Sequence, residues 1–115
     1  TIGHVRYLLD SGKVRELFPV LPDIHGLLMK FNKKSTYDRC LEYLERVILL
    51  AVEIRRRIPE PGKEPRYEKF LKQLSRVVAR KLELVAGAGK PRQARATVQR
   101  AMERLMADAA LDHVL

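Results

Sequence analysis

Apolar residues recur along this chain every three or four positions, which is the spacing of a helix rather than the alternation of a strand. The clearest pattern covers residues 35–58, where Ser35 can cap the helix and Asp38 lies near its positive end. Residues 47–52 are apolar on every side of that helix. Such a segment predicts a central helix buried against several neighbours.

The same spacing appears at residues 65–86 and 91–110. Glycines 87 and 89 end the first of these segments, because glycine takes the left-handed conformation common after a helix. Glycine and proline interrupt residues 1–34, where only short helical pieces are expected. The chain of 115 residues therefore predicts one all-α domain: an antiparallel bundle of three long helices, preceded by a broken helical segment.

The composition indicates a soluble chain that can bury a core, with 46% hydrophobic and 32% charged residues. The longest apolar run, 47–52, is far shorter than the about 20 residues of a membrane span. The N-terminus shows no apolar core of a signal peptide. Cys40 is the single cysteine, so an internal disulfide is excluded and a reducing, cytoplasmic location is expected.

Positive charge changes this picture, because the formal net charge is +9 and the pI is about 10.1. Residues 63–100 hold 11 Lys or Arg and 3 Asp or Glu, so nearly all of the excess lies there. On a helix, Lys69, Lys72, Arg76 and Arg80 fall within about 80° of one another, opposite the apolar face. Such single-sign clustering favours a surface that follows a nucleic-acid backbone over an ordinary solvated face.

Two sets of residues are candidates for nucleic-acid contacts. The main set is Arg66, Lys69, Lys72, Arg76, Arg80, Lys81, Lys90, Arg92, Arg95 and Arg100. A secondary basic set, Arg55, Arg56 and Arg57, ends the 35–58 helix, where cations also stabilise the helix dipole. Consecutive arginines point in three directions, so at most two of them can serve one ligand.

Catalytic motifs are not evident. The stretch ending in Gly89-Lys90 fails the phosphate-loop pattern, because Leu84 replaces its first glycine and Pro91 its hydroxyl residue. The histidines are too far apart to form a metal site: His4, His25 and His113. Cys40 is expected in the core, with a thiol pKa raised by the nearby acids at 38 and 42. We therefore expect no enzyme activity, no metal and no cofactor.

Four short stretches carry a family resemblance: Ser11 with residues 14–17, Tyr43-Leu44, Phe70-Leu71, and Val77-Val78-Ala79 with Lys81. Together they resemble the small all-helical subunits of CRISPR effector complexes, particularly the type III kind. The resemblance implies a non-catalytic antiviral-defence subunit that stacks in several copies along a guide–target duplex. Only Arg15 and Lys81 are cations on matched positions.

The sequence thus predicts a non-catalytic subunit that binds RNA or single-stranded DNA within a larger ribonucleoprotein. Its partners would be nucleic acid and other protein subunits, including copies of itself, with no membrane. Head-to-tail stacking would bring Asp108 and Asp112 of the acidic tail to the basic surface of a second copy. The alternative is an assembly adaptor whose basic face meets an acidic protein, with the Ala/Met face of the last helix packed on a partner.

Overall fold

A computed structural model describes residues 2–30, 37–87 and 92–114. Across them the structure contains helices and turns and no strand, so the all-α prediction is confirmed. The α-helices are α1 (Ile2–Asp10), α2 (Leu21–Leu28), α3 (Tyr37–Arg57), α4 (Pro65–Gly87) and α5 (Arg92–Leu111). Short 3₁₀ turns lie at η1 (Val14–Glu16), η2 (Phe18–Val20) and η4 (Pro61–Lys63).

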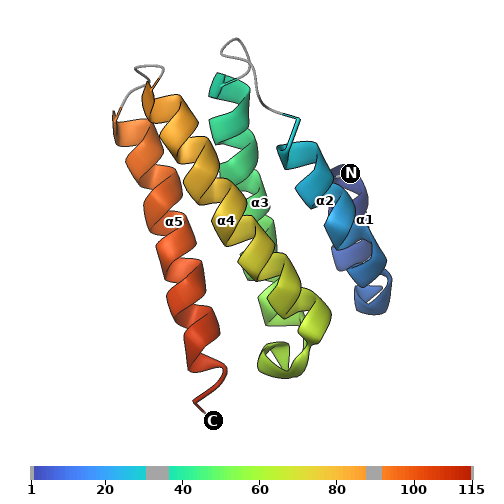
Figure 1. The fold of residues 1–115 in the computed structure, drawn as a ribbon. Helices are drawn as coiled ribbons and strands as arrows, with labels where there is room; N and C mark the ends of the chain where they lie inside the picture. Colours follow the sequence, from blue (N-terminus) through green and yellow to red (C-terminus); the bar gives the residue numbers. More distant parts are fainter. Residues whose placement is uncertain (1, 31–36, 88–91, 115) are drawn as a thin grey trace.

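The three long helices lie side by side, and the chain reverses direction from α3 to α4 and again from α4 to α5 (Figure 1). The helix α5 packs on both α3 and α4, whereas α1 contacts α3 and α2 contacts both α3 and α4. The broken N-terminal segment is therefore a pair of short helices on the opposite flank from α5 (Figure 1).

The helix α4 ends at Gly87, as predicted, but Gly87 does not take the left-handed backbone. Among the described residues the glycine with a left-handed backbone is Gly12, with φ of 71°. Gly12 ends α1: its amide donates to the carbonyl of Leu9, and the Lys13 amide donates to that of Leu8. The other predicted helix-end residues, Ser35 and Gly89, lie outside the described residues.

All five helices contribute to one cluster of buried apolar side chains. In this cluster the Tyr67 hydroxyl donates a 2.7 Å hydrogen bond to the carbonyl oxygen of Ala51, which joins α4 to α3. That bond satisfies the polar atom of a nearly fully buried ring. Burial raises the pKa of Tyr67, so the hydroxyl keeps its proton.

The central helix α3 is less enclosed than its apolar middle suggests. Val47, Ile48 and Ala51 are buried, but the Leu49 side chain is 56% exposed. Neighbouring helices therefore cover α3 on most sides and leave a strip uncovered. Cys40 is fully buried, as expected, and its pKa is raised, but the cause is burial rather than nearby acids, and the charge of Lys81 opposes it.

Candidate nucleic-acid interface

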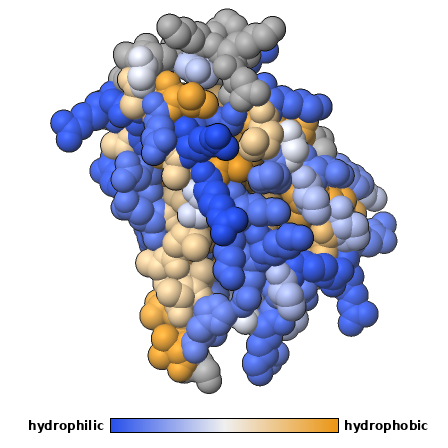
Figure 2. Space-filling model, viewed as in Figure 1, coloured by the Kyte–Doolittle hydropathy of each residue, from blue (hydrophilic) through white to orange (hydrophobic). Residues whose placement is uncertain are grey.

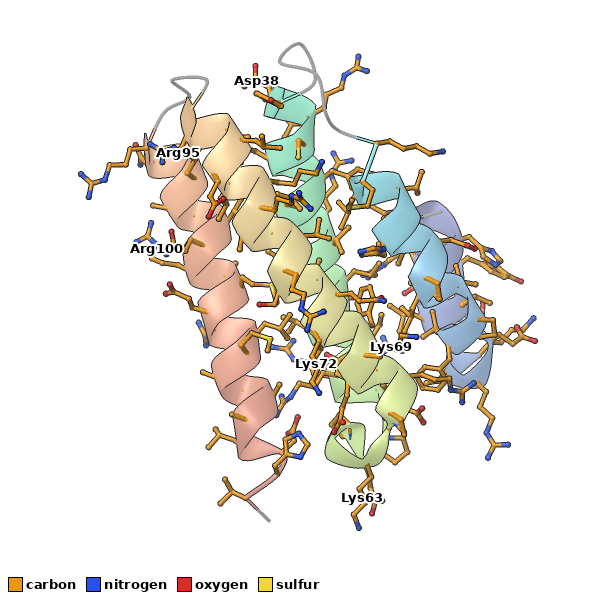
Figure 3. The ribbon with its side chains drawn as sticks, viewed as in Figure 1. Asp38, Lys63, Lys69, Lys72, Arg95 and Arg100 are labelled. Atoms are coloured by element: carbon orange, nitrogen blue, oxygen red, sulfur yellow. The ribbon has the colours of Figure 1, made fainter. Side chains whose placement is uncertain are left out.

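Four exposed cations follow the outward side of α4, opposite the residues that α4 buries in the core: Lys69, Lys72, Arg76 and Arg80. We call this set the α4 ridge. It extends for about 16 Å along the helix axis, given a rise of about 1.5 Å per residue. Figure 3 shows Lys69 and Lys72 near the N-terminal end of α4, and Figure 2 shows a hydrophilic band along this helix.

The α4 ridge has no internal neutralisation. Among the described residues, none of its four side chains takes part in an ion pair or a hydrogen bond. Glu83 is an exposed acid on the same side of α4, one turn beyond Arg80. The ridge therefore presents its charges to solvent, which is the arrangement that the sequence predicted for this segment.

Lys81 does not belong to this surface. Its side chain is only 3% exposed, because position 81 lies on the apolar face of α4 with Val78 and Val85. Its charge lies near Cys40, whose pKa it lowers against the effect of burial. Lys81 thus has no access to a phosphate backbone on the outside of α4, and the inclusion of Lys81 in the contact set is wrong.

The cations of α5 point into different places. Arg95 lies in the groove between α4 and α5, next to Ser75 and Met102, and its buried Nε has no hydrogen-bond partner among the described residues. Arg100 lies on the side of α5 away from α4 (Figure 3) and lines the groove between α5 and α3. Arg92 is exposed at the first residue of α5.

Lys90 of the main set lies outside the described residues. Among the described cations of that set, the α4 ridge is the largest group that shares one helix face. The α5 cations of that set do not extend the ridge into a single continuous surface, because α5 separates the groove that holds Arg95 from the groove that holds Arg100.

Arg55 is bound inside the molecule. It donates to the two carboxylate oxygens of Asp112 at 2.8 and 2.5 Å and to the Asp108 carbonyl at 3.1 Å. The hydrogen bond to Asp112 raises the pKa of Arg55. This contact joins the end of α3 to the chain just after α5. Asp112 is therefore ion-paired within its own chain, and the head-to-tail contact with a second copy stays a prediction.

Arg56 and Arg57 diverge, as consecutive positions on a helix require. Arg56 lines the groove between α3 and α5, together with Arg100, Arg104 and the exposed Leu49. Arg57 points the other way and donates a 3.0 Å hydrogen bond to the carbonyl of Leu9 at the end of α1. Arg55, Arg56 and Arg57 thus contact three different parts of the molecule.

A second basic feature lies where the ends of α1 and α3 meet the start of α4. A pocket of about 1000 Å³ opens there, which we call the junction pocket. Its charged lining residues are Lys13, Arg15, Arg57, Arg66, Glu16 and Glu64. The structure thereby brings together three arginines that the sequence analysis treated separately, and adds Lys13. The sequence signal for this turn is Gly12, which lies between the helical pieces.

Residues 2–30, 37–87 and 92–114 contain no group of three or more His, Cys, Asp or Glu side chains that could hold a metal ion. None of the helices described is long and apolar enough to cross a bilayer. The chain matches no protein-family model, no curated protein and no solved structure.

Proposed function

We propose that this chain is a non-catalytic helical protein that binds the backbone of RNA or single-stranded DNA through the α4 ridge. The observation that supports the proposal most is the nearly uniform sign of that surface: four exposed cations without an acidic partner among the described residues, with the acid Glu83 only beyond the end of the ridge. A solvated helix face usually mixes both signs. A polyanion is the ligand that such a face attracts most strongly.

The spacing of the ridge suits a repeating phosphate chain. Its cations follow one another every three or four residues, so they rise by about 4.5 to 6 Å from one to the next. Each phosphate contact releases condensed counterions and contributes about −0.7 to the slope of log K against log salt for single strands, so four contacts give a slope of about −3. The aromatic residues of α4, Tyr67 and Phe70, are buried. Base stacking on this helix is therefore absent, and sequence preference should be weak.

The core behind the ridge supplies a rigid base. Leu74 and Val78 are buried on the opposite side of α4, and the Tyr67 hydroxyl is bonded to α3. The backbone that carries the cations is therefore held by packing before any ligand arrives. Binding then costs ordering of the long side chains but no rearrangement of the helix.

The experiment is fluorescence anisotropy with RNA, single-stranded DNA and duplex DNA of matched sequence, from about 50 to 200 mM salt, where multi-phosphate contacts lose most affinity. The test variant carries Lys69→Ala, Lys72→Ala, Arg76→Ala and Arg80→Ala. We expect its affinity to fall and its salt slope to flatten by about 3. The order of the three wild-type affinities identifies the preferred nucleic acid.

A control variant with equal loss of charge distinguishes the ridge from net charge. It carries alanine at four exposed cations on other elements: Lys30, Arg39, Arg46 and Lys63. The control should retain most of the affinity and slope. Equal binding by the ridge variant and the wild type would contradict the proposal.

Membership of a ribonucleoprotein stays a prediction. The resemblance to CRISPR effector small subunits implies that several copies would lie along one guide–target duplex. Copurification of the tagged chain with RNA and with other effector subunits from its native cells would support it. Recovery of the chain alone, without RNA, would argue against it.

The groove between α3 and α5 favours a second candidate function, that of an assembly adaptor. The exposed Leu49 lies there beside Arg56, Arg100 and Arg104, in a hollow of about 440 Å³. An apolar residue in a groove lined by three cations and one acid, Asp108, fits an acidic amphipathic helix of a partner protein. No nucleic-acid binding at about 50 mM salt, together with a partner lost in Leu49→Asp, would favour this function over the first.

A further inference from the structure

The junction pocket lies at one end of the α4 ridge. Arg66 lines the pocket, and it also lines a smaller hollow of about 330 Å³ that it shares with Lys69. Lys69 is the first cation of the ridge, so positive charge continues from the ridge into the pocket. A strand that lies along the ridge would end at, or turn into, this pocket.

The charge of the pocket is unequal. Four cations, Lys13, Arg15, Arg57 and Arg66, face two acids, Glu16 and Glu64. The Glu64 carboxylate forms an ion pair with Arg66, in which Oε1 accepts a 3.2 Å hydrogen bond from Arg66 Nε.

Glu53 does not line the pocket, but the charge of Arg57 contributes to the lowered pKa of the Glu53 carboxyl. Its main partner is nevertheless Arg6 of α1, which forms an ion pair with it. The pocket therefore has two cations in excess of its acids, which suits an anionic ligand.

Neighbouring groups restrict the positions of three of these cations, and of the three only Arg66 forms an ion pair, with Glu64. Gly12 turns the chain at the end of α1 with φ of 71°, and the Lys13 Nζ lies 5.7 Å from the centre of the Tyr7 ring. Arg57 donates to a neutral acceptor, the Leu9 carbonyl. The Arg66 guanidinium lies 4.4 Å from the centre of the Phe18 ring, which restricts its plane.

Arg15 completes the pocket with a side chain that has no ion pair or hydrogen bond among the described residues. The site therefore combines oriented guanidinium groups with one cation that can adjust to a ligand. Bidentate donation by arginine matches the oxygens of a phosphate group.

We propose that the junction pocket binds a phosphate monoester, either the terminal phosphate of a nucleic-acid strand or that of a mononucleotide. A monoester carries a charge of about −1.5 to −2 at neutral pH, which matches the excess of two cations better than a single phosphodiester charge. A volume of about 1000 Å³ also exceeds what one phosphate needs and accommodates a nucleotide. The strand version of this inference rests on the proposed function, whereas the mononucleotide version does not.

Terminal phosphate recognition is tested with single strands of one sequence that differ only at the end. One pair carries a 5′-phosphate or a 5′-hydroxyl and a 3′ label; a second pair carries a 3′-phosphate or a 3′-hydroxyl and a 5′ label. We expect one phosphorylated end to bind at least about tenfold more tightly, which is the effect of one strong charge-assisted contact. The variant Lys13→Ala/Arg15→Ala should abolish that difference and retain binding of the hydroxyl-ended strand.

Two controls separate the pocket from the ridge. The ridge variant should weaken all four strands and keep the preference for the phosphorylated end. The double variant Arg39→Ala/Arg46→Ala removes two exposed charges from α3 and should leave the preference unchanged. Circular dichroism of each variant checks that the helices persist.

The mononucleotide source is tested by calorimetric titration of adenosine monophosphate, with adenosine as the matched ligand without phosphate. Binding of the monophosphate that is lost in Lys13→Ala/Arg15→Ala supports the pocket, even where the ridge variant shows that the proposed function fails. Equal affinity for phosphorylated and hydroxyl ends, together with no heat from the monophosphate, overturns the inference and leaves the proposed function standing. A preference that survives Lys13→Ala/Arg15→Ala also overturns it.

Discussion

The helices α4 and α5 are neighbours of similar length, with 23 and 20 residues, but they are fixed in different ways. Eight residues of α4 are buried, among them Tyr67 and Phe70, whereas α5 buries three: Val98, Met102 and Leu105. On its outward side α4 carries the cationic ridge, while α5 exposes small residues such as Ala107 and Ala110. The buried side chains of α4 thus fix the helix in the bundle, and this holds the cations of its outward side in position.

Polar contacts hold the C-terminal end of α5 instead of a large apolar face. Asp112 is bound by Arg55 of α3, and His113 Nε2 lies 3.3 Å from Glu68 Oε1 of α4. Gly62 of η4 packs closely against the Asp112 backbone, since a Cβ there would lie 2.7 Å from the Asp112 carbonyl oxygen. The comparison therefore predicts that core substitutions destabilise α4 and the whole fold, and that polar substitutions loosen α5.

The largest effect is expected for Leu74→Ala in α4. Leu74 is 1% exposed, and truncating a buried leucine costs about 2–5 kcal/mol through lost transfer energy and a residual cavity. Urea unfolding followed by circular dichroism measures the loss of free energy. Leu84→Ala, on the same helix at 41% exposure, is the control and should cost less than about 0.5 kcal/mol. Similar losses for both would contradict the asymmetry of α4.

The next effect is expected for Asp112→Asn. The substitution weakens a partly buried ion pair with Arg55, which should cost about 1–2 kcal/mol. Amide hydrogen exchange should show faster exchange in the last turns of α5, with little change in α4. Faster exchange in α4 as well would show that the two helices form one cooperative unit.

A similar but smaller effect is expected for Gly62→Ala. The added methyl group would meet backbone atoms of Asp112, so η4 or the end of α5 has to shift, at about 1 kcal/mol or somewhat more. Thermal unfolding measures the loss. Gly26→Ala serves as the control, because a Cβ at Gly26 meets no atom within 4 Å and that substitution within α2 should be neutral or stabilising.

The smallest effect on stability is expected for the α4 ridge variant with its four alanines. These cations make no ion pair or hydrogen bond among the described residues, and alanine is the best helix former. The free energy of unfolding should therefore change by less than about 1 kcal/mol, or rise as charge repulsion falls. A large loss would show that the ridge is structural and would weaken the proposed function.

Cys40 supplies a local probe of the same comparison. The thiol is buried and its pKa is raised by burial, so reaction with a thiol reagent at pH 8 should need opening of the core. The rate should increase in Leu74→Ala and stay near the wild-type value in Asp112→Asn. An increase in both variants would show that loosening α5 also opens the core around α3.

The sequence predicted the long helices well, because helical periodicity depends on residues three and four positions apart. It also predicted the outward α4 ridge for the same reason. Lys81 was misplaced although this periodicity includes it: three positions after Val78 and four before Val85, it falls on the buried face. The exposure of Leu49 could not be predicted from the sequence. In a helix segment that is apolar all round, the packing of the neighbouring helices decides which residues stay exposed.

What the sequence by itself determined is therefore what a single helix determines: the helical segments, the apolar face of each, and the row of cations on α4. The tertiary structure decided which cations share a surface. In the folded chain Arg55 binds Asp112, and Arg95 and Arg100 lie in separate grooves. One pocket is lined by Lys13, Arg15, Arg57 and Arg66. The reason is distance along the chain. Lys13 and Arg66 line the same pocket only after α1, α3 and α4 have packed together, and no local sequence pattern predicts that packing.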